Sequence, residues 1–410
     1  MKKFVLNRVR MGFALVCALL VMNSCIFNDE IDHKINRTVL VYIGADNNLS
    51  NTANSNIYAM NTSVSSGMDN YNLLVFLDRK DFAPALLHVH NLKIDTIAKY
   101  PELDTSDPMV LRKVIDDVLK DWKAEHYGLV MWSHGTGWIP TDKLHFVAPN
   151  MNYAPLRGNK VKTLLEGRRD PFGPETKAFS WEDRKGQSPS YTCMELGDMA
   201  DAIPDDVFDF ILFDACYMGN VEVMYALRNK AQYIISSCYE VVSYGFPYHI
   251  VTRDLLNGSV LKVCNEFYQY YNSMSGWEQM AGVSLVNTAE LDSLARCFRK
   301  IAAGYGANVD SIEVSKVQCF DRFNNHVFFD LEDVVEKLGT DRELMNEFRL
   351  QLAKCVSFKI STPYIFPGDA EQIKVNSYSG LSVYMPLSRY EASGLNDAYR
   401  QTEWSDYTGY

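Results

Sequence analysis

Short apolar runs that each stop at a polar turn recur along this sequence, with helical patterns between them. Residues 38–44, 73–77 and 128–132 are three such runs, rich in β-branched, leucine and aromatic side chains. Runs of this length and composition predict buried strands. Between the second and the third run, apolar residues recur at three- and four-residue spacing, which predicts an amphipathic helix. Its apolar positions are Leu111, Val114, Ile115, Val118 and Trp122.

The start of this helix is marked by Ser106, Asp107 and Pro108, because a capping side chain followed by proline suits a first helical turn. Strand, helix and strand over residues 72–132 form the parallel unit of an α/β sheet. A shorter run at 86–90 predicts a further strand in an edge hairpin. His88 and His90 would share one face of it, but the sequence shows no third ligand for a metal ion.

A fourth apolar run, residues 208–213, stops at Asp214 and is followed by a turn that contains Cys216. A helical pattern runs from there to about residue 230, and residues 232–237 predict another strand. The carboxyl ends of parallel strands are where ligands and chemistry collect. The partial positive charge at the start of the following helix would favour the thiolate form of Cys216.

A cysteine nucleophile needs a base, and the run at 128–132 stops in the same manner at His134. This histidine could instead only satisfy hydrogen bonds of its loop beside Trp132. The glycines at 135 and 137 favour a functional position, because glycine lets backbone N–H groups approach a substrate carbonyl closely. Cys216 and His134 are therefore the candidate nucleophile and base.

Residues 259–355 are largely helical by pattern, and residues 381–385 predict a strand that joins the sheet late in the chain. We expect an α/β fold with a mostly parallel central sheet flanked by helices and a helical C-terminal elaboration. No Pro/Gly/Ser-rich linker, repeat or low-complexity run divides residues 37–410. They are expected to form one domain, and the protein is expected to be a monomer.

The first 24 residues have the layout of a secretory signal. Basic residues precede an apolar run from Met11 to Met22 that is too short to span a bilayer comfortably. Asn23 and Ser24 then lead to Cys25, which predicts a lipoprotein processing site with lipid on Cys25. An ordinary cleaved signal is the alternative. Residues 25–36 would be a tether, and the protein would be exported to face the periplasm, the outer membrane or the cell surface.

The formal net charge of −11 and the pI near 5.3 argue against nucleic acid as a partner. The lipid, and not a basic patch, would then bind the membrane. Of nine cysteines, seven remain after Cys17 and Cys25, and an odd number indicates at least one free thiol. Their spacing shows no zinc pattern, and most lie in apolar contexts typical of small buried side chains.

Residues 141–191 differ from the rest in being polar and rich in proline and basic side chains. Long segments of this kind are commonly functional or poorly ordered. The segment is either an activation loop or an uncut surface loop. Its basic residues include Arg157, Lys160, Lys162, Arg168, Arg169, Arg184 and Lys185.

Two motifs together resemble those of the clostripain-like cysteine peptidases, peptidase family C11, which share the caspase/hemoglobinase-like fold. Residues 132–138 read Trp-Ser-His-Gly-Thr-Gly-Trp, and residues 213–219 read Phe-Asp-Ala-Cys-Tyr-Met-Gly. Residues 41–50, 237–248 and 380–386 also resemble family segments, so the resemblance covers nearly the whole mature chain.

The resemblance implies an endopeptidase that acts on protein or peptide substrates, with Cys216 as nucleophile and His134 as acid and base. It implies an oxyanion hole formed by the N–H groups of Gly135 and Cys216. Asp214 matches the family's acid at the floor of the substrate pocket. In the substrate-wall loop at 237–248 the acid present is Glu240. Cleavage after Arg or Lys is the favoured specificity.

The resemblance also implies self-cleavage between the histidine and the cysteine, within residues 141–191, to release the active enzyme. No cofactor and no metal follow from the chemistry. Calcium dependence occurs in part of the family, and the sequence shows no acidic cluster that would support it. Two alternatives remain open: a catalytically degenerate lipoprotein that acts as a binding module, and a hydrolase of small amides.

Overall fold

Parallel strands form the middle of a nine-stranded sheet in the computed structural model, which describes residues 35–64, 68–80, 82–147, 179–183 and 191–410. The predicted signal, Cys25 and residues up to 34 of the tether lie outside the described residues, as do 148–178 and 184–190 of the predicted activation loop. The parallel strands, in sheet order, are β2 (Tyr71–Arg79), β1 (Arg37–Ala45), β5 (His126–Trp132), β8 (Phe208–Asp214) and β9 (Ala231–Ser236).

The apolar composition of these strands follows from their place in the sheet. Every residue of β1 is buried, and in β8 only one residue is partly exposed. Strands covered on both faces read as continuous apolar runs and not as alternating ones. The predictions of strands at 38–44, 73–77, 128–132 and 208–213 are confirmed.

Antiparallel strands close both edges of the sheet. One edge is the hairpin of β3 (Phe82–His90) and β4 (Lys93–Lys99), which confirms the hairpin predicted around residues 86–90. The other edge is formed by β10 (Gly282–Asn287) and β12 (Val356–Ser361). β4 is largely exposed and carries a lysine at each end, a feature that discourages edge-to-edge pairing.

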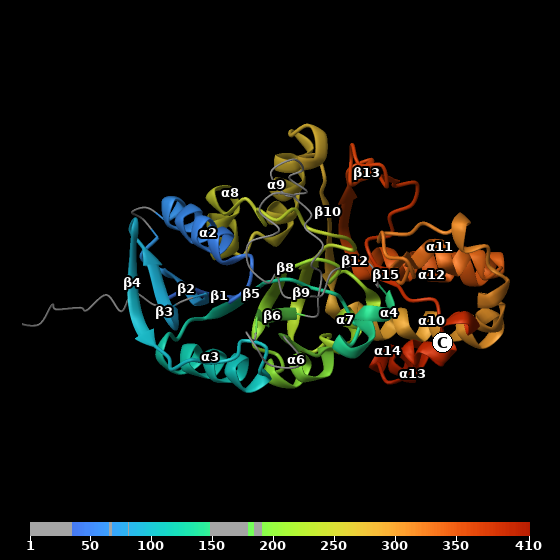
Figure 1. Ribbon diagram of the computed structural model, residues 1–410, viewed down its shortest axis with the longest axis horizontal. Coiled ribbons are helices and arrows are strands. Elements are labelled where there is room, and N and C mark those ends of the chain that lie inside the picture. Colours follow the sequence, from blue (N-terminus) through green and yellow to red (C-terminus); the bar gives the residue numbers. More distant parts are fainter. Residues whose placement is uncertain (1–34, 65–67, 81, 148–178, 184–190) are drawn as a thin grey trace, which may run out of the picture. The chain divides into compact units, whose positions relative to one another are not determined.

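Helices cover both faces of the sheet (Figure 1). On one face α2 (Ser50–Ser63) packs on α8 (Tyr248–Asn257), which packs on α9 (Val260–Asn272). On the other face α3 (Pro108–Asp121) packs on α6 (Leu196–Ala202), and α6 on α7 (Val221–Ala226). The predicted start of α3 is confirmed, because the Asp107 side chain accepts a hydrogen bond from the Met109 N–H and Pro108 opens the first turn.

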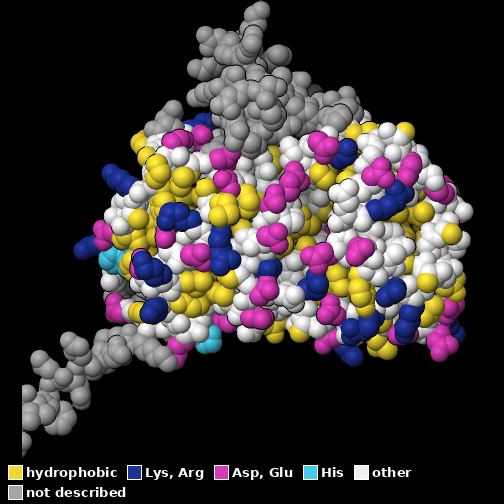
Figure 2. All heavy atoms as spheres, turned by 90° about the horizontal axis from the view of Figure 1, so that it is seen from below, with side chains coloured by type: hydrophobic (Ala, Val, Ile, Leu, Met, Phe, Trp, Pro, Cys, Tyr) yellow, Lys and Arg dark blue, Asp and Glu magenta, His cyan; other side chains and the backbone are white. Residues whose placement is uncertain are grey.

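The predicted helical elaboration follows β10, where α10 packs against both α12 and α14. No helix of the described residues combines the length and the apolarity that a membrane crossing requires. On the face that Figure 2 shows, acidic and basic side chains are interspersed. The helices of the elaboration are α10 (Leu291–Tyr305), α11 (Leu331–Lys337), α12 (Arg342–Cys355), α13 (Leu395–Arg400) and α14 (Glu403–Thr408).

The prediction that residues 381–385 join the central sheet is wrong. Only Ser382 and Val383 are extended, as β15, and they pair with the short strand β11 (Phe329–Asp330). The Ser382 N–H donates to the Gly219 carbonyl at 2.9 Å, directly behind the turn that follows β8. The segment is apolar because it is buried between this turn and the C-terminal helices, and a buried segment need not belong to a sheet.

Candidate active site

The turns after β5 and β8 lie side by side at the carboxyl edge of the sheet. Trp132 is paired with Asp214 across these two parallel strands. His134 and Cys216 each come two residues after that pair. The Ser133 N–H donates to the Asp214 carbonyl at 3.4 Å, so the two chains are still joined at the first residue beyond β5. The structure therefore brings the two predicted residues to one place.

Gly135 makes the close approach of these two turns possible. A Cβ atom added to Gly135 would lie 2.5 Å from the backbone oxygen of Cys216 and 3.0 Å from the Ala215 Cβ. Real Cβ atoms do not approach an oxygen so closely, so a larger residue would push the turns apart. Both backbone N–H groups that the sequence predicts for an oxyanion hole, those of Gly135 and Cys216, belong to these contacting turns.

The turn that carries Cys216 is held from behind by the chain that follows β9. Tyr217 has a φ of 59°, the left-handed region that a tyrosine seldom adopts. Its N–H donates to the Tyr239 carbonyl at 3.2 Å, and the Gly219 N–H donates to the Ser237 carbonyl at 2.6 Å. These bonds support a conformation that is unfavourable by itself.

The predicted effect of a helix start on Cys216 is wrong for this structure. α7 begins at Val221 and is capped by Asn220, whose side chain accepts a hydrogen bond from the Val223 N–H. Residues 217–219 separate Cys216 from that cap, and α7 spans only 6 residues. Because the field of a helix end fades within its first turn, the thiol gains little from it.

The Cys216 thiol lies against the backbone of Val241. Its Sγ accepts the Val241 N–H at 3.4 Å and lies 3.8 Å from the Val241 carbonyl oxygen. Burial raises the pKa of the Cys216 thiol, and the nearby Glu240 and Asp214 carboxylates raise it further. The Val241 N–H and Arg322 lower the pKa, without outweighing burial. The thiol is therefore protonated in this arrangement.

His134 is oriented by a side chain that the sequence interpretation did not select. Its Nε2 lies 2.8 Å from Oδ1 of Asn48, in the turn after β1. With the amide oxygen as acceptor, Nε2 carries the proton and Nδ1 is the basic nitrogen of the neutral ring. Asn47 stabilises the same turn by accepting the Leu49 N–H. In the sequence, Asp46, Asn47 and Asn48 gave only the signal of a polar turn.

Asp214, the last residue of β8, lies beneath the loop that follows β9. Its Oδ2 accepts hydrogen bonds from the Phe246 N–H at 3.0 Å and from the Tyr248 hydroxyl at 2.8 Å. Gly245 passes directly over it, since an added Cβ would lie 2.4 Å from Oδ2. Burial raises the pKa of Asp214 to about 6, against the opposing effect of these two donors. The acid can therefore gain a proton under mildly acidic conditions.

The comparisons with known proteins decide the family. The model of the clostripain family matches residues 41–152 and 167–407. This chain belongs to the clostripain family. Clostripain from Hathewaya histolytica is 26% identical over 446 residues, which cover 91% of this chain and 79% of that protein.

Solved structures of family members agree with this assignment. An inactive zymogen of a C11 protease from Parabacteroides distasonis is 31% identical, with a TM-score of 0.72 and coverage of 91% of this chain and 97% of that one. A secreted C11 cysteine protease from Bacteroides thetaiotaomicron, in complex with an irreversible peptide inhibitor, is 27% identical, with a TM-score of 0.72 and coverage of 91% and 99%. The predicted caspase-like fold is confirmed, and the protein is a clostripain-family cysteine endopeptidase that acts on peptides.

Glu240, the second acid predicted to contact substrate, has its contacts within the protein. It accepts a hydrogen bond from the Tyr217 hydroxyl at 2.9 Å, and its Oε1 lies 3.7 Å from Nε of Arg322. Only 4% of the Glu240 side chain is exposed. This position behind the cysteine turn does not favour the predicted contact with substrate.

The histidines of β3 offer no cluster for a metal ion. The rings of His88 and His90 stack at 4.3 Å, and Nε2 of His90 lies 2.7 Å from Oδ2 of Asp95. Burial lowers the pKa of His88 to about 4. Among the described residues, three side chains of suitable type lie close enough together to hold a metal ion elsewhere: Cys319, Asp321 and His326.

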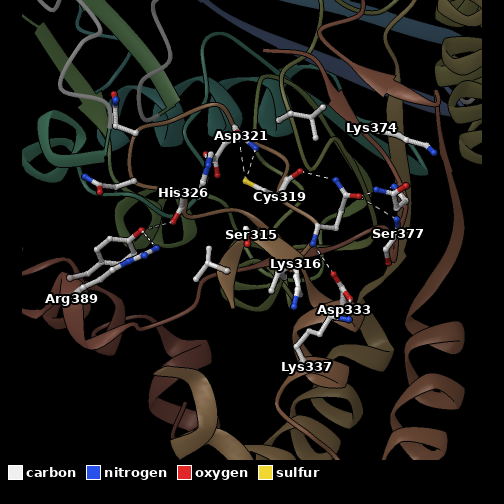
Figure 3. A pocket seen from close by; sticks show the side chains of 18 residues that line it. Ser315, Lys316, Cys319, Asp321, His326, Asp333, Lys337, Lys374, Ser377 and Arg389 are labelled. Carbon is white, nitrogen blue, oxygen red and sulfur yellow. Dashed lines mark hydrogen bonds and ion pairs between the residues drawn. The ribbon is translucent and has the colours of Figure 1, made fainter. Parts of the chain in front are cut away.

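This second set lines a pocket that Figure 3 shows. The Asp321 carboxylate already accepts three backbone N–H groups, those of residues 323, 327 and 328, and Nδ1 of His326 at 2.8 Å. The carboxylate is therefore occupied by hydrogen bonds within its own loop. In addition, four basic side chains in the pocket lining disfavour the binding of a cation. These are Lys316, Lys337, Lys374 and Arg389.

Proposed function

We propose that Cys216 and His134 are the catalytic pair of this clostripain-family protease. The observation that carries the proposal is the register of β5 and β8. Trp132 is paired with Asp214, and His134 and Cys216 each follow two positions after that pair. The Cys216 thiolate attacks the scissile carbonyl carbon, and the carbonyl oxygen becomes an oxyanion. When the C–N bond breaks, His134 gives a proton to the leaving amine, and water then hydrolyses the thioester.

The oxyanion would be bound by the N–H groups of Gly135 and Cys216. Their contribution is supported by the contact between the two turns, which Gly135 permits. In other acyl-transfer enzymes one such donor is worth about 3 kcal/mol of transition-state stabilisation.

The proposed specificity is cleavage after Arg or Lys, with Asp214 as the acid that meets the basic side chain. Its support is the buried carboxylate beneath Gly245 and Phe246, close to the cysteine turn. Glu240 is left out of the proposed substrate contacts because Tyr217 and Arg322 contact it.

The proposed activation step is a cut within residues 141–191. Two features support this step. The Cys216 thiol is protonated and accepts a hydrogen bond from the Val241 N–H. A relative of similar fold is described as an inactive zymogen. Cleavage would let the turns rearrange so that His134 can accept the thiol proton.

The proposed location is outside the cytoplasm, with the protein attached to a membrane by lipid on Cys25 and acting as a monomer. Support comes from the signal-like first 24 residues and from a relative described as secreted. Incorporation of radiolabelled palmitate into wild type but not into Cys25→Ser tests the lipid. Equal labelling of both proteins would contradict it.

The deciding experiment is labelling of protein without residues 1–25 by biotinylated acyloxymethyl ketones that carry Lys or a neutral residue. Mass spectrometry should find one adduct, on Cys216, with the Lys probe and none in His134→Ala. Cys238, which is fully buried, serves as the internal reference. Labelling only by the neutral probe would reject the basic specificity. Absence of labelling with every probe, also after nicking by trypsin, would favour the non-catalytic binding module.

Self-activation has its own test. Cys216→Ala protein should remain uncut within residues 141–191 during an incubation in which the wild type is cut. Cleavage of Cys216→Ala at the wild-type position, without added protease, would show that another protease is responsible.

A further inference from the structure

A buried pair of opposite charges lies behind the turn that carries Cys216. Tyr217 is the residue after the cysteine, and its hydroxyl donates to Oε1 of Glu240 at 2.9 Å. Nε of Arg322 lies 3.7 Å from the same oxygen. The exposed fractions of the two charged side chains are 4% for Glu240 and 14% for Arg322. A carboxylate in such a place needs both a donor and a positive charge to stay ionised.

The left-handed backbone of Tyr217 requires contacts that fix the residue. Its ring is fully buried and stacks on Phe328, with centroids 4.8 Å apart and planes 9° apart. Glu240 accepts a hydrogen bond from the hydroxyl at the tip of the Tyr217 side chain. The Tyr239 carbonyl accepts one from the Tyr217 backbone N–H. Because Cys216 shares a peptide bond with Tyr217, these contacts also set the direction of the Cys216 backbone.

Arg322 comes from the loop at 319–326, which the Asp321 carboxylate closes by accepting backbone N–H groups. Its guanidinium lies over the ring of Phe366 at 4.2 Å, and Nη1 lies 3.5 Å from Oδ2 of Asp369. Phe366 is fully buried and has a φ of 54°. Arg322 thus connects Glu240 with the segment between β13 (Tyr364–Ile365) and β14 (Ile373–Lys374).

We propose that Glu240 and Arg322 are positioning residues for Cys216: Glu240 fixes Tyr217 in its left-handed conformation, and Arg322 neutralises Glu240 so that a thiolate can form beside it. The proposal rests on Cys216 as the proposed nucleophile and adds two residues far from it in sequence. Neither residue needs to touch the substrate.

The charges around Cys216 show why neutralisation matters. The carboxylates of Glu240 and Asp214 act on the thiol as anions, and Arg322 acts on it as a cation. His134 lies on the adjoining turn. Glu240 raises the pKa of the Cys216 thiol and Arg322 lowers it. Without Arg322, the buried Glu240 charge would oppose the negative charge that the nucleophile must acquire.

The test measures thiol chemistry and turnover separately. The rate at which iodoacetamide modifies Cys216 is followed by mass spectrometry from pH 5 to 10 in wild type, Arg322→Met, Arg322→Lys and Glu240→Gln. Arg322→Met should move the midpoint of this profile upward by about one pH unit, which slows the reaction at neutral pH about tenfold. Glu240→Gln keeps an acceptor for Tyr217 and removes the charge, so its midpoint should move downward.

Turnover should follow the same order, with kcat reduced in Arg322→Met and KM almost unchanged. Arg322→Lys should recover part of the loss, and the double variant Glu240→Gln/Arg322→Met should react faster than Arg322→Met alone. Arg389→Met is the matched control, because Arg389 lines the pocket beside the loop at 319–326 but contacts Tyr390. It should leave the profile as in wild type.

Two results would overturn the proposal: identical profiles for wild type, Glu240→Gln and folded Arg322→Met, or an equal shift in Arg389→Met. If Arg322→Met fails to fold, the pH profiles of iodoacetamide modification in Glu240→Gln and Arg322→Lys test the proposal instead. Alkylation needs no peptidase activity. A shifted profile without any turnover would therefore contradict the proposed catalysis and leave the positioning role intact.

Discussion

At the scale of single residues, Asn48 shows how a side chain without acid–base chemistry of its own can orient the proposed catalytic histidine. Its amide oxygen lies 2.8 Å from Nε2 of His134 and so selects the tautomer in which Nδ1 is basic. The same amide restricts rotation of the imidazole. A variant at this position should therefore change turnover and leave substrate binding alone.

Asn48→Ala is expected to lower kcat about tenfold to a hundredfold, within the range that general acid–base catalysis contributes. KM for a Lys substrate should stay close to the wild-type value. Asn48→Asp keeps an acceptor for Nε2–H and should restore most of the turnover. Steady-state kinetics of the three proteins decide; equal losses in Asn48→Ala and Asn48→Asp would speak against an orienting role.

If Asp214 meets the basic side chain as proposed, the proposed preference for Arg and Lys substrates should depend on pH. The pKa of Asp214, about 6, means that it is ionised at pH 8 and mostly protonated at pH 5. The ratio of kcat/KM for a Lys substrate to that for a neutral analogue should therefore fall roughly tenfold from pH 8 to pH 5. Because both substrates use the same thiol and imidazole, the ratio isolates the pocket. In Asp214→Asn the ratio should be low at every pH, and a ratio independent of pH in wild type would exclude Asp214.

The sequence predicted the residues that come directly after strands, since an apolar run and its stop are local signals. It could not predict the partners that fold back onto them. Asn48 looked like an ordinary turn residue. Glu240 was assigned to substrate because it is the acid in the loop at 237–248, and its ion pair with Arg322 forms only in three dimensions. The left-handed Tyr217 was equally hidden, because tyrosine gives no sequence signal for that conformation.

At the scale of elements, the site is the contact between two turns, and that contact tolerates almost no extra volume. The turn after β5 meets the turn after β8 at Gly135, where a methyl group would lie 2.5 Å from the Cys216 carbonyl. An added methyl group must displace the backbone and not a flexible side chain. It would therefore change the geometry of the turn that carries Cys216.

Gly135→Ala is accordingly expected to abolish labelling of Cys216 by the Lys probe, while the protein stays folded. Gly197→Ala is the matched control, because Gly197 lies in α6 with nothing within 4 Å of an added Cβ. Alanine there should be neutral or stabilise by up to about 1 kcal/mol. Probe labelling and thermal unfolding measure both; normal labelling of Gly135→Ala would contradict the close contact.

At the scale of the whole molecule, a buried carboxyl group links folding to proton uptake. Glu222, in the first turn of α7, has no exposed surface, and its Oε1 accepts the Tyr384 N–H at 2.9 Å. Burial raises the pKa of Glu222 to about 8, from an ordinary value of 4.5. The folded protein therefore holds a proton there that the unfolded chain releases above pH 4.5.

The sign of the effect follows from that difference. A raised pKa adds stability that is complete below the unfolded pKa and disappears as pH rises through the folded pKa. The free energy of unfolding of wild type, relative to Glu222→Gln, should thus decrease from about pH 5 to pH 8. Urea unfolding at several pH values measures the difference, and a difference that stays constant with pH would show that Glu222 is ionised in the folded protein.

The parallel middle of the sheet could be predicted because its strands are uniform apolar runs, and the order of strands and helices then limits the topology. Two features could not be predicted. One is the antiparallel edge formed by β10 and β12, and the other is that β15 lies outside the central sheet. Burial makes residues 381–385 as apolar as a strand, and only the fold shows that their hydrogen bonds go to the cysteine turn and to β11.

The brace that residues 382–384 provide has a consequence for synthesis. The Ser382 N–H binds Gly219 and the Tyr384 N–H binds Glu222, so the cysteine turn and the helix after it acquire these supports only after residues 382–384 have left the ribosome, long after Cys216 itself. A nascent or interrupted chain carries the same cysteine and histidine without them. The order of translation thus separates the synthesis of the cysteine and the histidine from the synthesis of the segment that supports the cysteine turn.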